Sequence, residues 1–149
     1  MVGSALVIFF LVLAVMMTPS YTPNGTAGSN DNAITGQEMV PDSTLVNGRY
    51  VDYSAGLVGD NSYDLTILFF YAPWCPECRS FDQAINADNI PQNTQILKVD
   101  YDTSQDLRQQ YGITIQSSFV RVDHSGNKQS LWIGYGKDKS LNSIVENTK

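Results

Sequence analysis

The feature that constrains the fold most is an apolar run at residues 65–71 that leads, through a short break, into a pair of cysteines. The run reads Leu-Thr-Ile-Leu-Phe-Phe-Tyr, and nearly continuous apolar character over this length predicts a strand covered on both faces. A break at residues 72–74 contains a proline, and residues 75–87 then carry apolar side chains at helical spacing. A buried strand that leads straight into a helix is typical of α/β proteins.

The rest of the chain alternates between strand and helix patterns in the same way. Ser104 is placed to cap one helix at its start, and Gly112 is placed to end that helix in a left-handed conformation. The whole order predicts an α/β fold with a central mixed β-sheet and helices on both faces. Besides the two elements above, we expect strands over residues 49–53, 95–100, 119–122 and 129–133, the last two forming a hairpin, and helices or turns over residues 54–59, 104–111 and 139–147.

The composition excludes several classes of protein. Nine basic and 15 acidic side chains give a net charge of −6, which argues against a nucleic-acid partner because phosphate binding needs an excess of Lys and Arg. Two cysteines are too few for a disulfide-rich scaffold. Two cysteines and one histidine also exclude a zinc knuckle within one chain, unless carboxylates or a second chain contribute. We therefore expect neither nucleic-acid binding nor a built-in metal site.

The first residues have the character of a membrane segment. Residues 1–18 carry no charged side chain, and Ala5 to Met17 is an unbroken apolar run. As a helix, the segment would span about 25 Å, somewhat less than the roughly 30 Å of a bilayer's hydrocarbon core. An uncleaved anchor and a cleaved signal peptide both remain open, since no Lys or Arg precedes the run and no Ala-x-Ala cleavage site follows it. An ordinary core helix is the remaining alternative.

Either membrane interpretation predicts that the rest of the chain faces the extracytoplasmic side. Residues 19–42 are rich in Thr, Ser, Asn, Gly and Pro and show no periodicity, which predicts a flexible linker. Residues 43–149 are then a single folded domain, which is long enough to hold its core without disulfides.

The segment Trp-Cys-Pro-Glu-Cys at residues 74–78 carries the chemistry. Pro76 has a fixed φ and no N–H, so it suits the first helical position and makes Cys75 a natural N-cap. Unpaired N–H groups and the positive end of the helix then favour a thiolate on Cys75. This effect is worth up to about 2 kcal/mol, or roughly one pKa unit. Cys75 is therefore predicted to be the attacking thiolate and Cys78, one turn later, the resolving thiol.

Other roles for the two cysteines are a stapling disulfide, idle thiols or metal binding. A ring this short gives roughly 2 kcal/mol of stability in the chain-entropy model, against about 3 for a loop of 15 residues. A staple is therefore the weaker interpretation on energetic grounds, and redox chemistry is the stronger one.

Residues 67–78 resemble the active-site region of the thioredoxin family, and the resemblance extends over about residues 48–147. Its motifs are Trp-Cys-x-x-Cys after a strand, Lys-Val-Asp-x-Asp in the next strand, Tyr-Gly-Ile after a helix, and a closing hairpin and helix. The resemblance implies a thioredoxin-like fold. It also implies that Cys75 and Cys78 are the nucleophilic and resolving cysteines and form a redox-active disulfide.

The same resemblance gives expectations for residues around the cysteines. It implies that Trp74 flanks the active-site surface and that Lys98 lies beneath the site. The dipeptide between the cysteines is Pro76-Glu77, where thioredoxins typically have Gly-Pro. Glu77 should oppose the effect of the helix on the pKa of the nucleophile, and Arg79 is placed to offset part of that charge.

Two further positions depart from the family pattern. Phe69 stands where the family has a buried aspartate that assists proton transfer for the resolving thiol, so Lys98, Glu77 or water would have to serve instead. Ser117 stands where the family has the cis-proline that faces the disulfide. A cis bond before a non-proline residue costs about 2.5–4 kcal/mol, so we expect the bond before Ser117 to be trans.

These observations predict an exported or membrane-tethered thiol–disulfide oxidoreductase. Its substrates would be protein disulfides or dithiols, it would need no cofactor in the chain, and a separate redox partner would reset it. The alternative is a non-enzymatic thioredoxin-like module that binds a client protein or a soft metal ion. Loss of the aspartate at Phe69 and of the proline at Ser117 motivates this alternative.

Overall fold

A computed structural model describes residues 45–149 of the chain. The predicted membrane segment (residues 1–18) and linker (residues 19–42) lie outside the described residues, so the predicted domain boundaries stay predictions. Among residues 45–149, no helix combines the length and the apolar character that crossing a membrane requires.

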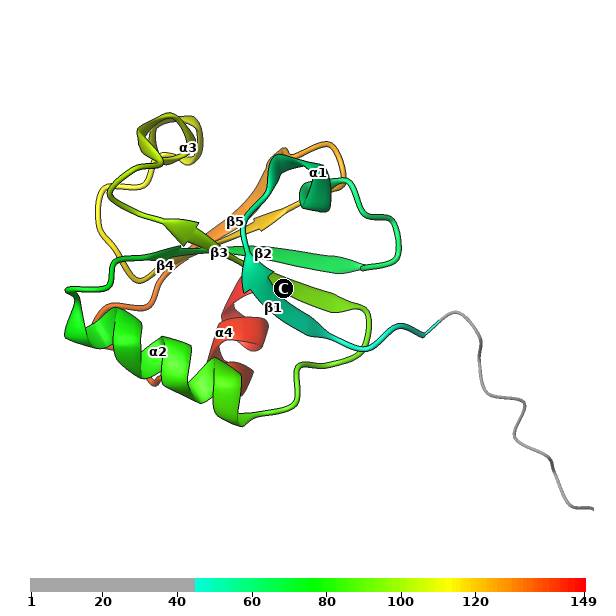
Figure 1. Ribbon diagram of the computed structural model, residues 1–149, viewed down its shortest axis with the longest axis horizontal. Coiled ribbons are helices and arrows are strands. Elements are labelled where there is room, and N and C mark those ends of the chain that lie inside the picture. The colour runs from blue at the N-terminus through cyan, green and yellow to red at the C-terminus, as the bar shows by residue number, and fades with distance from the viewer. Residues whose placement is uncertain (1–44) are drawn as a thin grey trace, which may run out of the picture. The chain divides into compact units, whose positions relative to one another are not determined.

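The described residues form a mixed β-sheet with the strand order β1-β3-β2-β4-β5. β1, β3 and β2 run parallel, while β4 runs antiparallel to β2, and β5 runs antiparallel to β4. The predicted mixed sheet and closing hairpin are therefore confirmed (Figure 1). The elements are β1 (Arg49–Asp52), α1 (Ala55–Val58), β2 (Leu65–Tyr71), α2 (Pro76–Ala87), β3 (Thr94–Asp100), α3 (Gln105–Tyr111), β4 (Ser118–Val122), β5 (Lys128–Ile133) and α4 (Leu141–Thr148).

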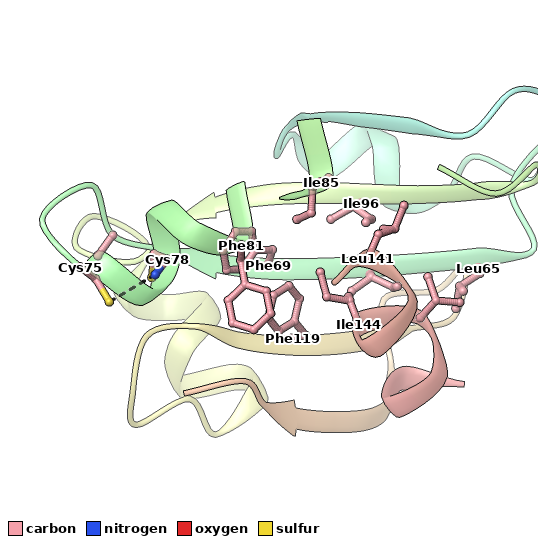
Figure 2. Close-up of a cluster of buried hydrophobic side chains, with 13 residues drawn as sticks. Leu65, Phe69, Cys75, Cys78, Phe81, Ile85, Ile96, Phe119, Leu141 and Ile144 are labelled. Atoms are coloured by element: carbon pink, nitrogen blue, oxygen red, sulfur yellow. Dashed lines mark hydrogen bonds between the residues drawn. The ribbon is translucent and has the colours of Figure 1, made fainter. Parts of the chain in front are cut away.

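β2 is the middle strand, and its side chains alternate between two hydrophobic clusters. On one face, Ile67 and Phe69 pack with residues of α2 and α4. On the other face, Leu68 and Phe70 pack with residues of α1 and α3. Helices thus cover both faces of the sheet, as predicted (Figure 1). Figure 2 shows the first cluster, with Phe81 and Ile85 of α2 and Ile144 of α4 directed at the sheet and the two cysteines at its edge.

Three helix ends show how local sequence sets the boundaries. α3 ends at Gly112, which adopts the predicted left-handed conformation with φ 72°. Ser104 lies at the N-cap position of α3, but its hydroxyl makes no cap hydrogen bond, because its backbone (φ −93°, ψ 54°) is not the extended conformation of a side-chain cap. α4 begins at Leu141, two residues later than residue 139, because the Ser140 hydroxyl caps it by accepting a hydrogen bond from the Ser143 N–H at 3.1 Å.

Candidate active site

The two cysteines lie where β2 ends and α2 begins. Cys75 is the N-cap of α2, with an extended backbone (φ −84°, ψ 119°), and Pro76 takes the first helical position, as the sequence predicts. The Cys78 N–H donates a hydrogen bond to the Cys75 sulfur at 3.5 Å, the dashed line in Figure 2. One of the unpaired N–H groups at the start of the helix therefore points at the sulfur that was expected to be the nucleophile.

Both cysteines are free thiols and both are buried. The exposed fraction is 1% for Cys75 and 0% for Cys78. The nucleophile expected from the sequence is therefore almost fully covered. The reason is packing, because both cysteines belong to the hydrophobic cluster between the sheet and α2. Little of the Cys75 side chain is therefore open to a substrate in this state of the protein.

The pKa values of the two thiols shift in opposite directions. Burial alone would raise the pKa of Cys75, but hydrogen bonds from the Cys78 N–H and thiol, and from the Ser117 and Gln116 side chains, outweigh burial and lower it. Burial raises the pKa of Cys78, and its interaction with the neighbouring Cys75 raises it further. This asymmetry suits Cys75 to be a thiolate and Cys78 to remain a thiol in the resting pair.

Ser117 lies directly against the cysteines. No cis peptide bond occurs in residues 45–149, so the bond before Ser117 is trans, as expected, and the residue adopts a left-handed backbone with φ 59°. Its N–H donates to the Phe70 carbonyl at 3.0 Å, and its carbonyl accepts from the Gly134 N–H at 2.8 Å. Its hydroxyl oxygen lies 3.1 Å from the Cys78 sulfur and 3.9 Å from the Cys75 sulfur.

The family resemblance places Ser117 where a proline faces the cysteines, but it gives the Ser117 hydroxyl no role. A serine in place of the family's proline was the available signal. The left-handed backbone that aims the hydroxyl depends on bonds to β2 and to the segment after β5, and such contacts between distant segments cannot be read from the local sequence.

Glu77 is neutralised by a residue that the sequence analysis missed. Its carboxylate pairs with Lys139 at 2.5 Å and accepts a hydrogen bond from the Gly136 N–H at 2.9 Å. The Lys139 hydrogen bond and the Gly136 N–H lower the pKa of Glu77. The expectation that Arg79 offsets this charge is wrong, because the Arg79 guanidinium donates instead to the Pro73 carbonyl at 3.0 Å.

Lys98 lies on the same face of the sheet as α2 and is paired with a carboxylate of that helix. Its ammonium group contacts Asp82 of α2 at 3.1 Å and lies over the rings of Tyr50 and Tyr71. The Tyr50 hydroxyl donates to the same Asp82 oxygen at 2.6 Å. Of the groups that were expected to serve the resolving thiol, Lys98 and Glu77 therefore both have other partners.

Trp74 forms part of the surface beside the cysteines. Its side chain is 57% exposed, and its indole N–H donates to Asp102 at 2.8 Å. The predicted position of Trp74 at the rim agrees with this exposure. Within residues 45–149, the structure brings no three His, Cys, Asp or Glu side chains together in an arrangement suited to a metal ion.

Comparison with known proteins identifies a relationship over most of the described residues. Residues 56–147 match the family model described as Thioredoxin. The chain is similar to a thioredoxin-like protein of Fusarium culmorum, with 33% identity over 64 residues that make up 40% of this chain and 53% of that protein. It is also similar to Thioredoxin-T of Drosophila melanogaster, with 29% identity over 77 residues, 50% of this chain and 48% of that protein. The chain thus spans about half the length of these two relatives.

Solved structures show the same fold. Trxlp from Edwardsiella tarda matches with a TM-score of 0.53 and 20% identity, over 68% of this chain and 100% of that chain. A mutant thioredoxin from Halobacterium salinarum matches with a TM-score of 0.52 and 22% identity, over 68% of this chain and 91% of that chain. These likenesses support the thioredoxin-like fold of the sheet and its helices.

Proposed function

The chain belongs to the thioredoxin family, and from this premise we propose that it is a thiol–disulfide oxidoreductase that acts on protein disulfides or dithiols through Cys75 and Cys78. The observation that carries the proposal is the placement of Cys75 as the N-cap of α2. There its sulfur accepts the Cys78 N–H, and its pKa is lowered while the pKa of Cys78 is raised. A nucleophile and a resolving thiol need this difference.

The proposed reaction proceeds in two exchanges. The Cys75 thiolate attacks one sulfur of a substrate disulfide, so that a mixed disulfide forms and the other substrate sulfur leaves as a thiolate. The Cys78 sulfur, after losing its proton, then attacks the Cys75 sulfur and forms the Cys75–Cys78 disulfide. The second substrate sulfur leaves and takes up a proton, so that the substrate gains two electrons and the cysteine pair loses two.

The reaction needs no cofactor within the chain, but it needs a second redox partner to return the cysteine pair to its starting state. The direction of net transfer follows from the reduction potential, which spans about −270 to −120 mV among proteins with such active sites. A value near the low end makes the protein a reductant and a value near the high end makes it an oxidant.

The uncharged apolar run at residues 1–18 supports a second part of the proposal, that the protein is held at a membrane or exported, with the domain on the extracytoplasmic side. Alkaline carbonate extraction of membranes from expressing cells tests this. Retention in the membrane pellet indicates an anchor, release of a shortened chain into the medium or periplasm indicates a signal peptide, and a full-length chain in the soluble cytoplasmic fraction would contradict both.

The near-complete burial of Cys75, at 1% exposure, favours a second candidate function. A covered thiol suits a non-enzymatic module that binds a client protein or a soft metal ion and does not exchange disulfides. In that case the reduced protein would bind a thiophilic ion such as Cu(I) tightly in a titration and would leave disulfides intact.

Reduction of insulin by the full chain in the presence of dithiothreitol, followed by turbidity, tests the proposed activity. We expect wild type to accelerate precipitation, and both Cys75→Ser and Cys78→Ser to lose that acceleration. When the reduced variants are incubated with insulin without dithiothreitol, only Cys78→Ser should accumulate mixed disulfides, which non-reducing electrophoresis detects as adducts through Cys75. Wild type without acceleration, together with Cys78→Ser without adducts, would reject the enzyme and leave the binding module.

A further inference from the structure

The resolving thiol lies in a buried site, and none of the charged side chains around it in the described part of the chain is hydrogen-bonded to its sulfur. Cys78 is fully buried among apolar side chains that include Phe69 and Phe81. The charged groups near the start of α2 and on β3 have other partners: Glu77 pairs with Lys139, Lys98 pairs with Asp82, and Arg79 donates to the Pro73 carbonyl. A sulfur that must become a thiolate in such a place is disfavoured, because burial penalises the charged form. Its attack therefore needs a hydrogen-bond donor that is already in position.

Ser117 supplies a donor of this kind. Its hydroxyl oxygen is 3.1 Å from the Cys78 sulfur, and its 3.9 Å distance to the Cys75 sulfur places it beside both reacting atoms. Ser117 itself is fully buried, so water does not compete for the contact through an open surface. A hydrogen bond to an ionised group is stronger than one between neutral groups, and this gain rises as the thiolate forms.

The backbone around Ser117 fixes the hydroxyl in that place. A left-handed φ of 59° is unfavourable for a residue with a Cβ atom. The bonds from its N–H to the Phe70 carbonyl and from the Gly134 N–H to its carbonyl hold the residue from both sides. Strained residues of this type persist where surrounding structure determines them, and they concentrate at functional sites.

We propose that the Ser117 hydroxyl is a catalytic group of the resolving step, donating a hydrogen bond to the Cys78 sulfur as it becomes the attacking thiolate. The proposal rests on the proposed oxidoreductase function. In this step the Cys78 S–H bond breaks, the Cys75–Cys78 bond forms, and the bond between Cys75 and the substrate sulfur breaks. The proton passes to the leaving substrate thiolate, and Ser117 ends the step as the same neutral hydroxyl.

The test separates capture from resolution with the aromatic disulfide 5,5′-dithiobis(2-nitrobenzoate), mixed with the reduced full chain at equal concentration in a stopped-flow instrument. Capture by Cys75 releases the first coloured thiolate, and attack by Cys78 releases the second. Cys78→Ser should release only the first. The variants are Ser117→Ala, which removes the hydroxyl and keeps the backbone strain, and Ser117→Gly, which removes the hydroxyl and relieves the strain.

A matched control lies next in the chain. Ser118 is also a buried serine, but its hydroxyl donates to the Ile115 carbonyl at 2.7 Å, so Ser118→Ala removes a buried hydroxyl of the same segment without touching the sulfurs. Circular dichroism and urea unfolding show which variants are folded. If Ser117→Ala does not fold, Ser117→Gly can still be used for the test.

We expect both Ser117 variants to slow the second release about tenfold, a factor that corresponds to about 1.4 kcal/mol, and to change the first release by less than about threefold. Ser118→Ala should keep the wild-type rate of the second release. A wild-type rate in both Ser117 variants would overturn the proposal and leave the oxidoreductase standing. The proposal would also be overturned if the second release were slow in Ser117→Ala but not in Ser117→Gly. Equal slowing of that release in Ser118→Ala would overturn it too. If wild type itself releases only one thiolate, the proposed function fails and this inference fails with it.

Discussion

Phe69 stacks on Phe119, with ring centroids 4.4 Å apart and ring planes inclined by 6°. The two residues are direct partners across β2 and β4, and Phe69 also meets the edges of Phe81 and Tyr71. The position that holds a carboxyl group in the thioredoxin pattern is therefore the centre of an aromatic cluster in this chain. The aromatic cluster packs with Cys78 in one hydrophobic cluster and contains no group that could accept a proton from its thiol.

Truncation of the Phe69 side chain should destabilise the protein strongly. Phe69→Ala is expected to lower the free energy of unfolding by about 3–5 kcal/mol, because it removes a fully buried ring and leaves a cavity that rigid neighbours cannot fill. Urea unfolding of the reduced protein measures the loss. Phe69→Leu, which keeps most of the apolar volume, should cost clearly less. A loss below about 1 kcal/mol for the alanine variant would mean that the cluster rearranges around the gap.

The strand at residues 65–71 was predictable to the residue, because the apolar run is bounded by Asp64 on one side and by the break at residues 72–74 on the other. The N-cap position of Cys75 was predictable for a local reason too, since Pro76 restricts both itself and the residue before it. The start of α4 was placed two residues too early, because the spacing of the apolar side chains does not mark the first residue of a helix, whereas the capping bond from the Ser143 N–H to Ser140 does.

The electrostatic partners within the site were not predictable in the same way. Lys139 and Glu77 are far apart in the sequence, and their ion pair depends on how the segment after β5 returns past the start of α2. The pairing of Lys98 with Asp82 likewise depends on the packing of α2 over β3. Charged side chains leave no periodic pattern that could show such contacts in advance. The covering of Cys75 has the same origin, because it arises from several packed segments.

The lowered pKa of Cys75 predicts the pH dependence of its reactivity. The hydrogen bonds to its sulfur stabilise the thiolate, so the rate of alkylation by iodoacetamide should reach half of its plateau below the value of about 8.5 that is usual for a cysteine. Below that midpoint the rate should fall with decreasing pH as the thiolate takes up a proton. Peptide mass spectrometry should find the label on Cys75 and not on Cys78, whose pKa is raised. A midpoint at or above 8.5 would contradict the assignment.

The ion pair between Glu77 and Lys139 should tune that midpoint. Glu77→Gln removes a negative charge next to the nucleophile and is expected to lower the alkylation midpoint of Cys75, whereas Lys139→Met leaves Glu77 unpaired and should raise it. Each shift should amount to a few tenths of a pH unit, since the pair is partly exposed, and should shrink in about 1 M salt.

The pair at the end of the chain provides the control for this prediction. Lys149 contacts Glu146 in the last turn of α4, so Lys149→Met removes the same charge from another exposed ion pair. Its alkylation midpoint should match that of wild type. Equal shifts in Lys139→Met and Lys149→Met would mean that net charge, and not the position of Lys139, controls the thiolate.

Gly134 should be intolerant of a side chain because it closes the site behind Ser117. A Cβ atom there would lie 2.7 and 2.9 Å from ring carbons of Phe81 and 3.0 Å from the Ser117 carbonyl oxygen. Gly134→Ala is therefore expected to lower the free energy of unfolding by about 1–3 kcal/mol, the usual cost of overpacking, as measured in urea.

Gly56 is the control, because a Cβ atom there meets no atom within 4 Å. Gly56→Ala should leave stability unchanged or raise it by up to about 1 kcal/mol through its helix propensity. If the two variants unfold at the same urea concentration, the Gly134 backbone is free to move away from Phe81. The hydrogen bond from the Gly134 N–H would then restrain Ser117 less than these distances imply.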